Sequence, residues 1–215
     1  MIHELGKQSS LLSQYLAEIR DESIQKDRMR FRRNLERIGE LLGYEVSKTL
    51  EFETKEVTTP LGVAEVQVLK EQPVLATILR AGLPMHHGLL NVFDNADNAF
   101  VSAYRRYHKS GEFEIEVEYS SSHAITDRTL IIADPLIATG SSVELVYKSL
   151  LAKGIPLQIH VISAISSNQG ITHLRQRLPA GTQFWTVAMD HELTARAYIV
   201  PGLGDAGDLA YGTKG

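Results

Sequence analysis

The chain is predicted to be an α/β protein built on a doubly wound, mainly parallel sheet with flanking helices. Short apolar runs rich in β-branched residues recur at residues 74–79, 130–133, 157–162 and 184–188. Segments with helical apolar spacing follow several of them, and this alternation of strands and helices is typical of parallel sheets. Two of the runs end at a charged residue, Arg80 or Asp134, and a loop of small residues begins within four positions of each, as expected at the ligand-binding edge of an open sheet.

Composition excludes several classes of protein. The 215 residues are 43% hydrophobic, which suffices for one domain with a sizeable core over residues 1–215. A net charge of -4 and a pI near 6.1 give no indication of a nucleic-acid binder. The absence of cysteine excludes disulfides and a cysteine nucleophile, and no run approaches the roughly 20 apolar residues of a membrane span. We therefore expect a cytoplasmic protein without nucleic-acid or membrane partners.

The N-terminal region, about residues 9–47, is predicted to form two helices. The first covers residues 9–20, with Ser10 as a cap, and the second covers residues 26–47, where leucine and isoleucine recur at helical spacing. Arginines and a lysine cluster at the start of the second helix. RNA contact is one interpretation, but the charges point around the helix, which favours a solvated face or a subunit contact.

A change to strand-like alternation marks about residues 51–73, with a Pro-Leu-Gly turn at residues 60–62. This pattern predicts a hairpin arm, and we expect the arm to embrace a second subunit. The core of the domain is expected to follow over about residues 74–190, with a binding tail at about residues 191–215.

The most informative segment is residues 129–142, Thr-Leu-Ile-Ile-Ala-Asp-Pro-Leu-Ile-Ala-Thr-Gly-Ser-Ser. Its apolar run predicts a strand buried on both faces, and Asp134 ends that strand. Residues 138–142 then supply small side chains and hydroxyls before a helical pattern at residues 143–153. Backbone N–H groups and the helix dipole favour an anion there, whereas an ordinary capping turn is the alternative. Because a carboxylate accepts hydrogen bonds from ribose hydroxyls, Asp134 favours a sugar phosphate.

A second anion site is indicated by Arg80-Ala81-Gly82, which follow the strand predicted at residues 74–79. A guanidinium binds phosphate oxygens in pairs, and Pro84 suits the first turn of the helix that follows. By itself, this tripeptide is more often structural. The adjacent His86 and His87 suggest a metal, but neighbours in a helix diverge by about 100°, which favours a structural or interface role.

The tail carries Tyr-Ile-Val-Pro-Gly-Leu-Gly-Asp-Ala-Gly-Asp over residues 198–208. Gly202 to Gly207 match G-x-G-x-x-G in form, but too few residues follow for the helix, strand and acid of a dinucleotide site. Three glycines and two aspartates without a helix predict backbone held against a flat ligand. A frayed chain end is the alternative, although the apolar residues 198–201 indicate an anchored segment.

Residues 134–142 and 198–208 together resemble the uracil phosphoribosyltransferase family. That branch carries Asp-Pro, as in Asp134-Pro135, where most related transferases carry two adjacent acids. The resemblance covers nearly the whole chain. It implies a phosphoribosyltransferase-like fold and transfer of a phosphoribosyl group from phosphoribosyl pyrophosphate (PRPP) to uracil, giving UMP. It also implies Mg²⁺ carried by the substrate, with no direct protein ligand. Pro84 and His86-His87 depart from the family's pattern, and Tyr211 replaces a phenylalanine.

The resemblance also assigns the site. The residues expected to contact PRPP are Arg80, Ala81, Gly82, Arg105, Asp134, Pro135, Leu136, Ile137, Ala138, Thr139, Gly140, Ser141, Ser142 and Asp205. Those expected to contact uracil are Tyr198, Ile199, Gly204, Asp205 and Ala206. Asp205, Arg105 and Asp134 are expected to be catalytic. Arg105 directly follows a strand that the sequence predicts at residues 100–104, and it is expected to reach the pyrophosphate once a lid at residues 107–122 closes. No side chain stands out as a general base, although Asp205 is a candidate.

Three other functions would leave different features in the sequence. A non-catalytic nucleotide-sensing regulator of pyrimidine genes would need a broad basic surface for RNA. A purine or orotate transferase would lack this tail and carry paired acids. A metallohydrolase is poorly supported, because Ala195 stands where H-E-x-x-H needs its second histidine. A homodimer or homotetramer is expected, and the sequence leaves open both that choice and regulation by GTP.

Overall fold

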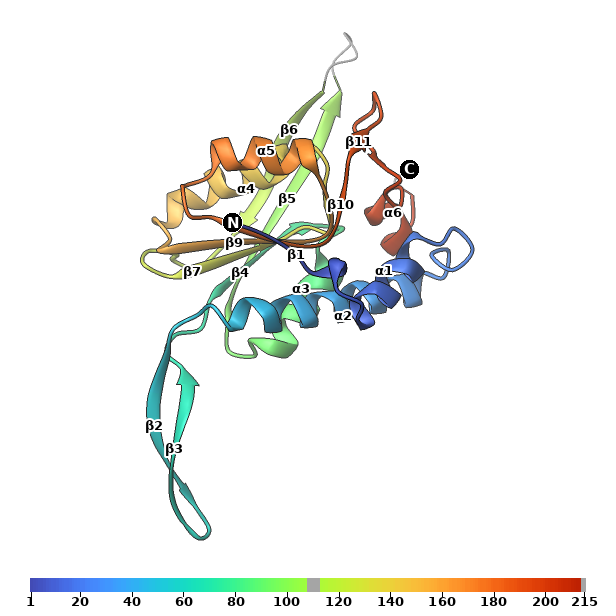
Figure 1. Ribbon diagram of the computed structural model, residues 1–215. Helices are drawn as coiled ribbons and strands as arrows, with labels where there is room; N and C mark the ends of the chain where they lie inside the picture. The colour runs from blue at the N-terminus through green and yellow to red at the C-terminus, as the bar shows by residue number, and fades with distance from the viewer. Residues whose placement is uncertain (108–112, 214–215) are drawn as a thin grey trace.

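The computed structural model describes residues 1–107 and 113–213, with side chains described outside residues 103–118. Its centre is an eight-stranded sheet in the order β1-β10-β9-β7-β4-β5-β6, with β8 also paired to β9. Every pair is parallel except β5 with β6. The predicted mainly parallel sheet with flanking helices is therefore confirmed (Figure 1).

The sheet strands are β1 (Ile2–Glu4), β4 (Val74–Leu79), β5 (Asp97–Tyr107), β6 (Phe113–Ser121), β7 (Thr129–Ala133), β8 (Leu136–Ile137), β9 (Gln158–Ser167) and β10 (Gln183–Asp190). Two smaller antiparallel pairs are β2 (Phe52–Thr59) with β3 (Gly62–Leu69) and β11 (Glu192–Leu193) with β12 (Ile199–Val200). The helices are α1 (Leu11–Arg20), α2 (Arg28–Ser47), α3 (Leu83–Val92), α4 (Ser141–Leu150), α5 (Asn168–Arg177) and α6 (Ala206–Tyr211), with 3-10 turns η1 (Leu5–Lys7) and η2 (Leu151–Lys153).

Helices cover both faces of the sheet. Helices α4 and α5 lie on one face, and α1, α2 and α3 lie on the other (Figure 1). The core divides accordingly, with Leu35 and Ile38 of α2 buried on one side and Val146 and Leu150 of α4 buried on the other. Residues 130–133 of β7 are apolar and buried, as expected for a strand with both faces covered. No helix within the described part of the chain combines the length and apolar character that crossing a membrane requires.

The basic cluster of α2 is used for contacts within the chain. Arg30 forms a two-bond pair with Glu18 of α1, both at 2.9 Å. Arg32 donates to the Ala210 carbonyl of α6 at 2.6 Å, and Arg37 lies over a tyrosine ring of α1. These arginines hold α1 and α6 against α2. Arg28, Arg30 and Arg33 are nevertheless exposed, so the solvated face favoured from sequence coexists with these contacts, and the alternative of a subunit contact remains a prediction.

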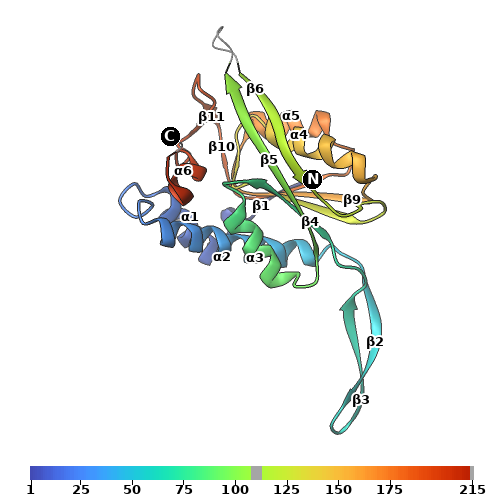
Figure 2. The same ribbon diagram turned by 180° about the vertical axis from the view of Figure 1, so that it is seen from behind.

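The predicted hairpin arm is present. Strands β2 and β3 extend away from the rest of the molecule (Figures 1 and 2). The arm exposes large apolar side chains at Phe52, Leu61 and Val63. Its contact with a second subunit remains a prediction.

Two sequence-based boundaries are wrong. The strand expected to end before Arg105 continues to Tyr107, because β6 pairs with β5 and extends its hydrogen bonding beyond the core. The tail expected to lack a helix contains α6, because Asp205 caps a turn whose alanines pack into the core. Of the predicted lid, residues 108–112 lie outside the described residues.

The adjacent histidines have different environments. His86 is fully buried against Phe100, whereas His87 is exposed. Burial lowers the pKa of His86 to about 4, so it is neutral at pH 7. Within residues 1–107 and 113–213, no group of three or more histidines or acids could hold a metal ion.

Helices α2 and α3 pack with their backbones close together. A Cβ atom at Gly88 would overlap the Glu36 carbonyl oxygen, and one at Gly39 would overlap the Met85 carbonyl oxygen. Glycine at both positions therefore allows α3 to lie directly on α2, and α3 begins at the end of the Arg80 loop.

Gly88→Ala is expected to lower the free energy of unfolding by about 1–3 kcal/mol, because the new methyl group must displace a helix backbone. In an isolated helix the same change would stabilise by about 1 kcal/mol, so the sign is diagnostic. Denaturant unfolding measures it. His87→Ala, at an exposed position of the same helix, is the control and should change stability by less than about 0.5 kcal/mol. A stabilised Gly88→Ala protein would contradict this packing.

Candidate functional site

The Arg80 loop, residues 80–82, is one of the two predicted anion loops and lies beside the end of β7. Strands β4 and β7 are parallel neighbours, with Thr77 opposite Ala133, so the loops that follow them emerge at one sheet edge. A Cβ atom at Gly82 would lie 2.9 Å from the Ala133 carbonyl oxygen and 2.8 Å from that of Ile78. Glycine therefore lets this loop pack against β7, immediately before Asp134.

The other predicted anion loop, residues 138–142, ends in the first turn of α4 and is called the anion loop below. Gly140 is the residue before the helix and has φ of 81°, a left-handed conformation that favours glycine. No side chain caps α4; Thr139 Oγ1 instead accepts from the Ser141 N–H at 3.3 Å. The ordinary capping turn, with Thr139 or Ser142 as the helix cap, is therefore not what forms. The loop presents a helix N-terminus, which favours anions.

The start of α5 supports this loop from behind. Ser167 Oγ donates to the Ala138 carbonyl oxygen and accepts from the Gly170 N–H at 2.8 Å. A Cβ atom at Gly140 would lie 2.8 Å from the Gly170 carbonyl oxygen. The anion loop is thus fixed by close backbone contact with a second helix.

Residues between Asp134 and the anion loop join the sheet. Leu136 and Ile137 form β8 opposite Ile165 and Ser166, and the Pro135 carbonyl accepts from two β9 N–H groups. Sequence reasoning missed β8 because two residues are too few for a periodic pattern. Since the Ile137 side chain is buried in the core, any contact it makes with a ligand must come from its backbone.

The C-terminal segment lies against the Arg80 loop. Arg80 Nη2 is 3.4 Å from Asp208 Oδ1 and 3.2 Å from the Gly212 carbonyl oxygen. A Cβ atom at Gly207 would lie 3.9 Å from the Ala81 Cβ. Segments that are separated by more than a hundred positions in sequence are therefore neighbours, as a shared site requires.

The segment is anchored, as its apolar residues predicted. Ile199 is buried in β12, and Ala206 is buried at the start of α6. Tyr198, Gly204 and Asp205 are exposed. Asp205 caps α6, with its Oδ1 accepting from the Asp208 N–H at 3.0 Å.

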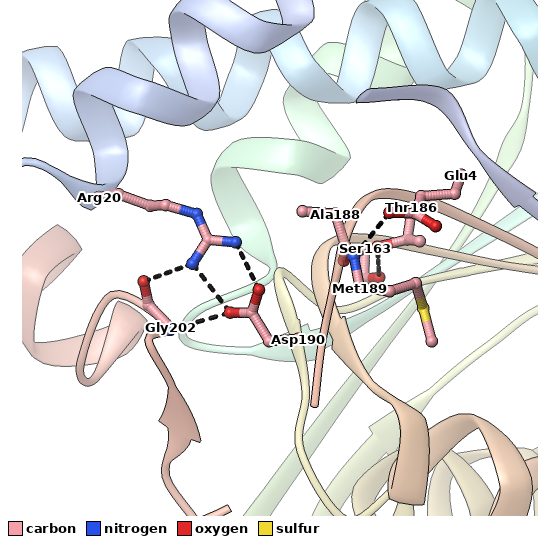
Figure 3. Close-up of polar contacts among 8 residues, drawn as sticks. All are labelled: Glu4, Arg20, Ser163, Thr186, Ala188, Met189, Asp190 and Gly202. Carbon is pink, nitrogen blue, oxygen red and sulfur yellow. Dashed lines mark hydrogen bonds and ion pairs between the residues drawn. The ribbon is translucent and has the colours of Figure 1, made fainter. Parts of the chain in front are cut away.

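An ion pair behind this segment was not predicted. Arg20 donates to both carboxylate oxygens of Asp190 at 2.8 Å and to the Gly202 carbonyl oxygen at 2.8 Å (Figure 3). Burial would raise the pKa of Asp190, but the hydrogen bonds from Arg20 and the Gly202 N–H outweigh it and lower that pKa below its usual value. The position of Asp190, directly at the end of an apolar run like that of Asp134, could have identified it.

Arg105 cannot be placed in the site. Its backbone belongs to β5 and lies opposite Ile115 of β6, but its side chain lies outside the described part of the chain. Its contact with pyrophosphate remains a prediction.

The fold and the two adjacent anion loops define the class of type I phosphoribosyltransferases. The structure of AQ2163 protein from Aquifex aeolicus superposes with a TM-score of 0.87 at 29% identity, covering 99% of this chain and 98% of that one. A crystal structure of Mycobacterium tuberculosis orotate phosphoribosyltransferase in complex with PRPP gives 0.52 at 11% identity, covering 87% and 95%, and shares the fold alone.

The chain belongs to the uracil phosphoribosyltransferase family, whose model matches residues 6–213. The uracil phosphoribosyltransferase of Porphyromonas gingivalis is 55% identical over 214 residues, which cover 100% of this chain and 99% of that protein. That of Pyrococcus furiosus is 38% identical over 207 residues, covering 95% and 87%.

Gly140→Ala is expected to raise the KM for PRPP roughly tenfold, because the substitution combines a strained φ with overlap against α5. Steady-state kinetics with varied PRPP measures it. Gly181→Ala is the matched control, because Gly181 also has a positive φ of 100° but faces open space. Equal KM values in the two variants would show that the close contact with α5 does not shape the loop.

Proposed function

We propose that the chain transfers the phosphoribosyl group of PRPP to the ring nitrogen N1 of uracil, giving UMP and pyrophosphate in pyrimidine salvage. The observation that carries this proposal is the convergence of three segments at one sheet edge in a chain of this family: the Arg80 loop, the end of β7 with its anion loop, and the C-terminal segment. One domain over residues 1–215 would contain the whole site.

The phosphate and ribose of PRPP are assigned to the strand–loop–helix unit after β7. The 5′-phosphate would accept hydrogen bonds from backbone N–H groups of residues 138–142 and from their hydroxyls, at the positive end of α4. Asp134, half-buried directly before this loop, would accept from the ribose hydroxyls. These contacts would fix the sugar and leave its C1 carbon open to attack.

The pyrophosphate is assigned to the Arg80 loop. Arg80 Nε is buried and has no hydrogen-bond partner among the described residues, and the Nη2 contacts with Asp208 and Gly212 are long. Phosphate oxygens would satisfy such a guanidinium better. Charge grows on the departing pyrophosphate in the transition state, so Arg80, with Arg105 and the magnesium that enters with the substrate, would stabilise it there.

The base is assigned to the backbone around Ile199, Gly204 and Ala206. Gly204 has φ of 96°, and a Cβ atom there would meet no atom of the described residues within 4 Å, so its exposed backbone has open space beside it in this part of the chain. Uracil presents acceptor, donor and acceptor groups along the edge away from its reactive nitrogen. Backbone N–H and carbonyl groups can match that pattern, and cytosine reverses part of it.

Little acid–base chemistry is required by this mechanism. Departure of pyrophosphate would lead, leaving an oxocarbenium-like ribose that uracil then attacks. Positioning of the two substrates and electrostatic stabilisation would provide most of the rate. Uracil N1 loses its proton as the new bond forms. Asp205, exposed at the start of α6 and beside the proposed base site, would contact the sugar and is the candidate to accept that proton.

We also propose a homo-oligomer, dimer or tetramer, in which the exposed apolar side chains of the arm contact a second subunit. The rival regulator of pyrimidine genes is less well supported, because Arg30, Arg32 and Arg37 of the basic cluster are engaged within the chain. GTP is retained as a candidate effector and is included as a condition in the assay below.

A spectrophotometric assay with PRPP, magnesium and each free base, with and without GTP, tests this function. UMP formation from uracil is expected, with a preference over cytosine on the order of a hundredfold, because each buried group left unpaired costs about 1–3 kcal/mol. Size-exclusion chromatography of the same preparation gives the oligomeric state. Absence of UMP, or equal turnover of cytosine, would refute the proposal.

Asp205→Ala and Asp205→Ser separate two roles of this residue. Alanine removes both the carboxylate and the α6 cap, whereas serine keeps a cap that accepts from the Asp208 N–H. If the carboxylate contacts substrate, kcat/KM should fall about tenfold or more in both variants. Recovery of activity by serine alone would show that Asp205 serves only as the cap.

A further inference from the structure

The ion pair between Arg20 and Asp190 has no part in the chemistry proposed above, yet it contacts the C-terminal segment directly. Arg20 is the last residue of α1, and Asp190 is the last residue of β10. Two N–H···O bonds of 2.8 Å join them, a third of 2.8 Å reaches the Gly202 carbonyl oxygen, and Asp190 accepts from the Gly202 N–H at 2.9 Å (Figure 3). Both backbone groups of Gly202 are therefore bound by the pair.

This pair is more than a surface contact. The Asp190 side chain is 7% exposed and that of Arg20 is 22% exposed. A guanidinium and a carboxylate joined by two parallel hydrogen bonds are held in one relative orientation. The Asp190 carboxylate accepts from two Arg20 nitrogens and from the Gly202 N–H, so it has little freedom to move. The pair therefore fixes the position of Gly202 relative to α1 and the sheet.

Gln25 binds the next carbonyl of the same segment. With its amide nitrogen turned toward the segment, the orientation that satisfies both of its amide atoms, Gln25 donates to the Leu203 carbonyl oxygen at 2.9 Å and to that of Ile19 at 3.2 Å. Two consecutive carbonyls, those of Gly202 and Leu203, thus accept hydrogen bonds from α1 and the turn after it.

These contacts determine where the N–H groups point. A trans peptide unit is planar, and its N–H is directed opposite to its carbonyl. Because the Gly202 and Leu203 carbonyls face Arg20 and Gln25, the N–H groups of Leu203 and Gly204 face away from them. Gly204 is exposed beside open space, and the left-handed φ values of Gly202 and Gly204, 53° and 96°, let the backbone hold this arrangement.

We propose that Arg20 and Asp190 are positioning residues that set the orientation of the peptide groups at residues 202–204 and so determine affinity and selectivity for the base. Gln25 assists them. This inference rests on the proposed function, in which the backbone near Gly204 binds uracil. It adds that the N-terminal helix contributes to base recognition from behind the binding surface.

Arg20→Lys tests the inference, because lysine keeps the charge but not the planar set of three hydrogen bonds. The KM for uracil is expected to rise roughly tenfold, the KM for PRPP to stay within about twofold, and the preference for uracil over cytosine to fall. Gln25→Ala, a milder change in a half-exposed residue, should shift the uracil KM in the same direction.

Arg30→Lys is the matched control. Arg30 of α2 makes a comparable two-bond pair with Glu18 of α1, the helix that carries Arg20, and within the described residues both of its hydrogen bonds go to Glu18 and none to the C-terminal segment. Its KM values for both substrates should equal those of the unmodified chain. Since KM does not depend on the active fraction, partial misfolding cannot imitate the expected result, and Gln25→Ala decides the question if Arg20→Lys fails to fold.

The outcomes separate this inference from the proposed function. No UMP formation by the unmodified chain refutes the proposed function. An active unmodified chain with unchanged uracil KM in Arg20→Lys and Gln25→Ala refutes the inference alone. Equal rises in both KM values, or a fall in kcat only, indicate a general structural role and also refute it.

Discussion

The pairing of β4 beside β7 in parallel is the constraint on which the candidate site depends. Parallel neighbours end at the same sheet edge, so Arg80 and Asp134 come together although more than fifty residues separate them. The pairing is maintained by strands that are buried on both faces and by helices packed over them. Gly82 then permits contact between the two strand ends. Strand pairing and core packing therefore bring the two anion loops to one edge, and the hydrogen bonds of Ser167 then hold the loop at residues 138–142 in place.

The sequence was most informative where an apolar strand pattern ended at a charged residue. The runs around residues 74–79 and 130–133 predicted buried strands, and small residues at the end of each predicted loops that the structure brings together. Arg80 and Asp134 were identifiable because a charged residue at the end of an apolar strand is unusual. Asp190 satisfies the same rule at the end of β10, but no motif followed it, so its partner Arg20 could not be deduced from local pattern.

The remaining features were unpredictable for physical reasons. Strand β8 is too short for periodicity, and it forms because Pro135 and Leu136 meet an extended β9. Helix α6 contradicts the local glycine content and is stabilised by the Asp205 cap and by burial of Ala206 and Ala210. The partners of the α2 arginines lie on helices whose placement only the tertiary fold determines. In each case long-range contact overrides local preference.

Two different parts of the structure hold the candidate site: the central sheet holds the anion loops, and the C-terminal segment provides the proposed base site. The anion loops follow strands of the central sheet, which hold them in fixed positions. Fixed positions suit a substrate whose pyrophosphate gains negative charge in the transition state, because the groups that stabilise this charge must already be in place. The proposed base site is backbone, and backbone groups recognise a ligand only when their peptide planes are fixed. Gly202 and Gly204 give that backbone its conformation, but glycine also makes it mobile. In the positioning role proposed for it, the partly buried pair of Arg20, from the N-terminal helix, with Asp190 restricts that mobility, which accounts for a polar contact behind a segment with few side chains of its own.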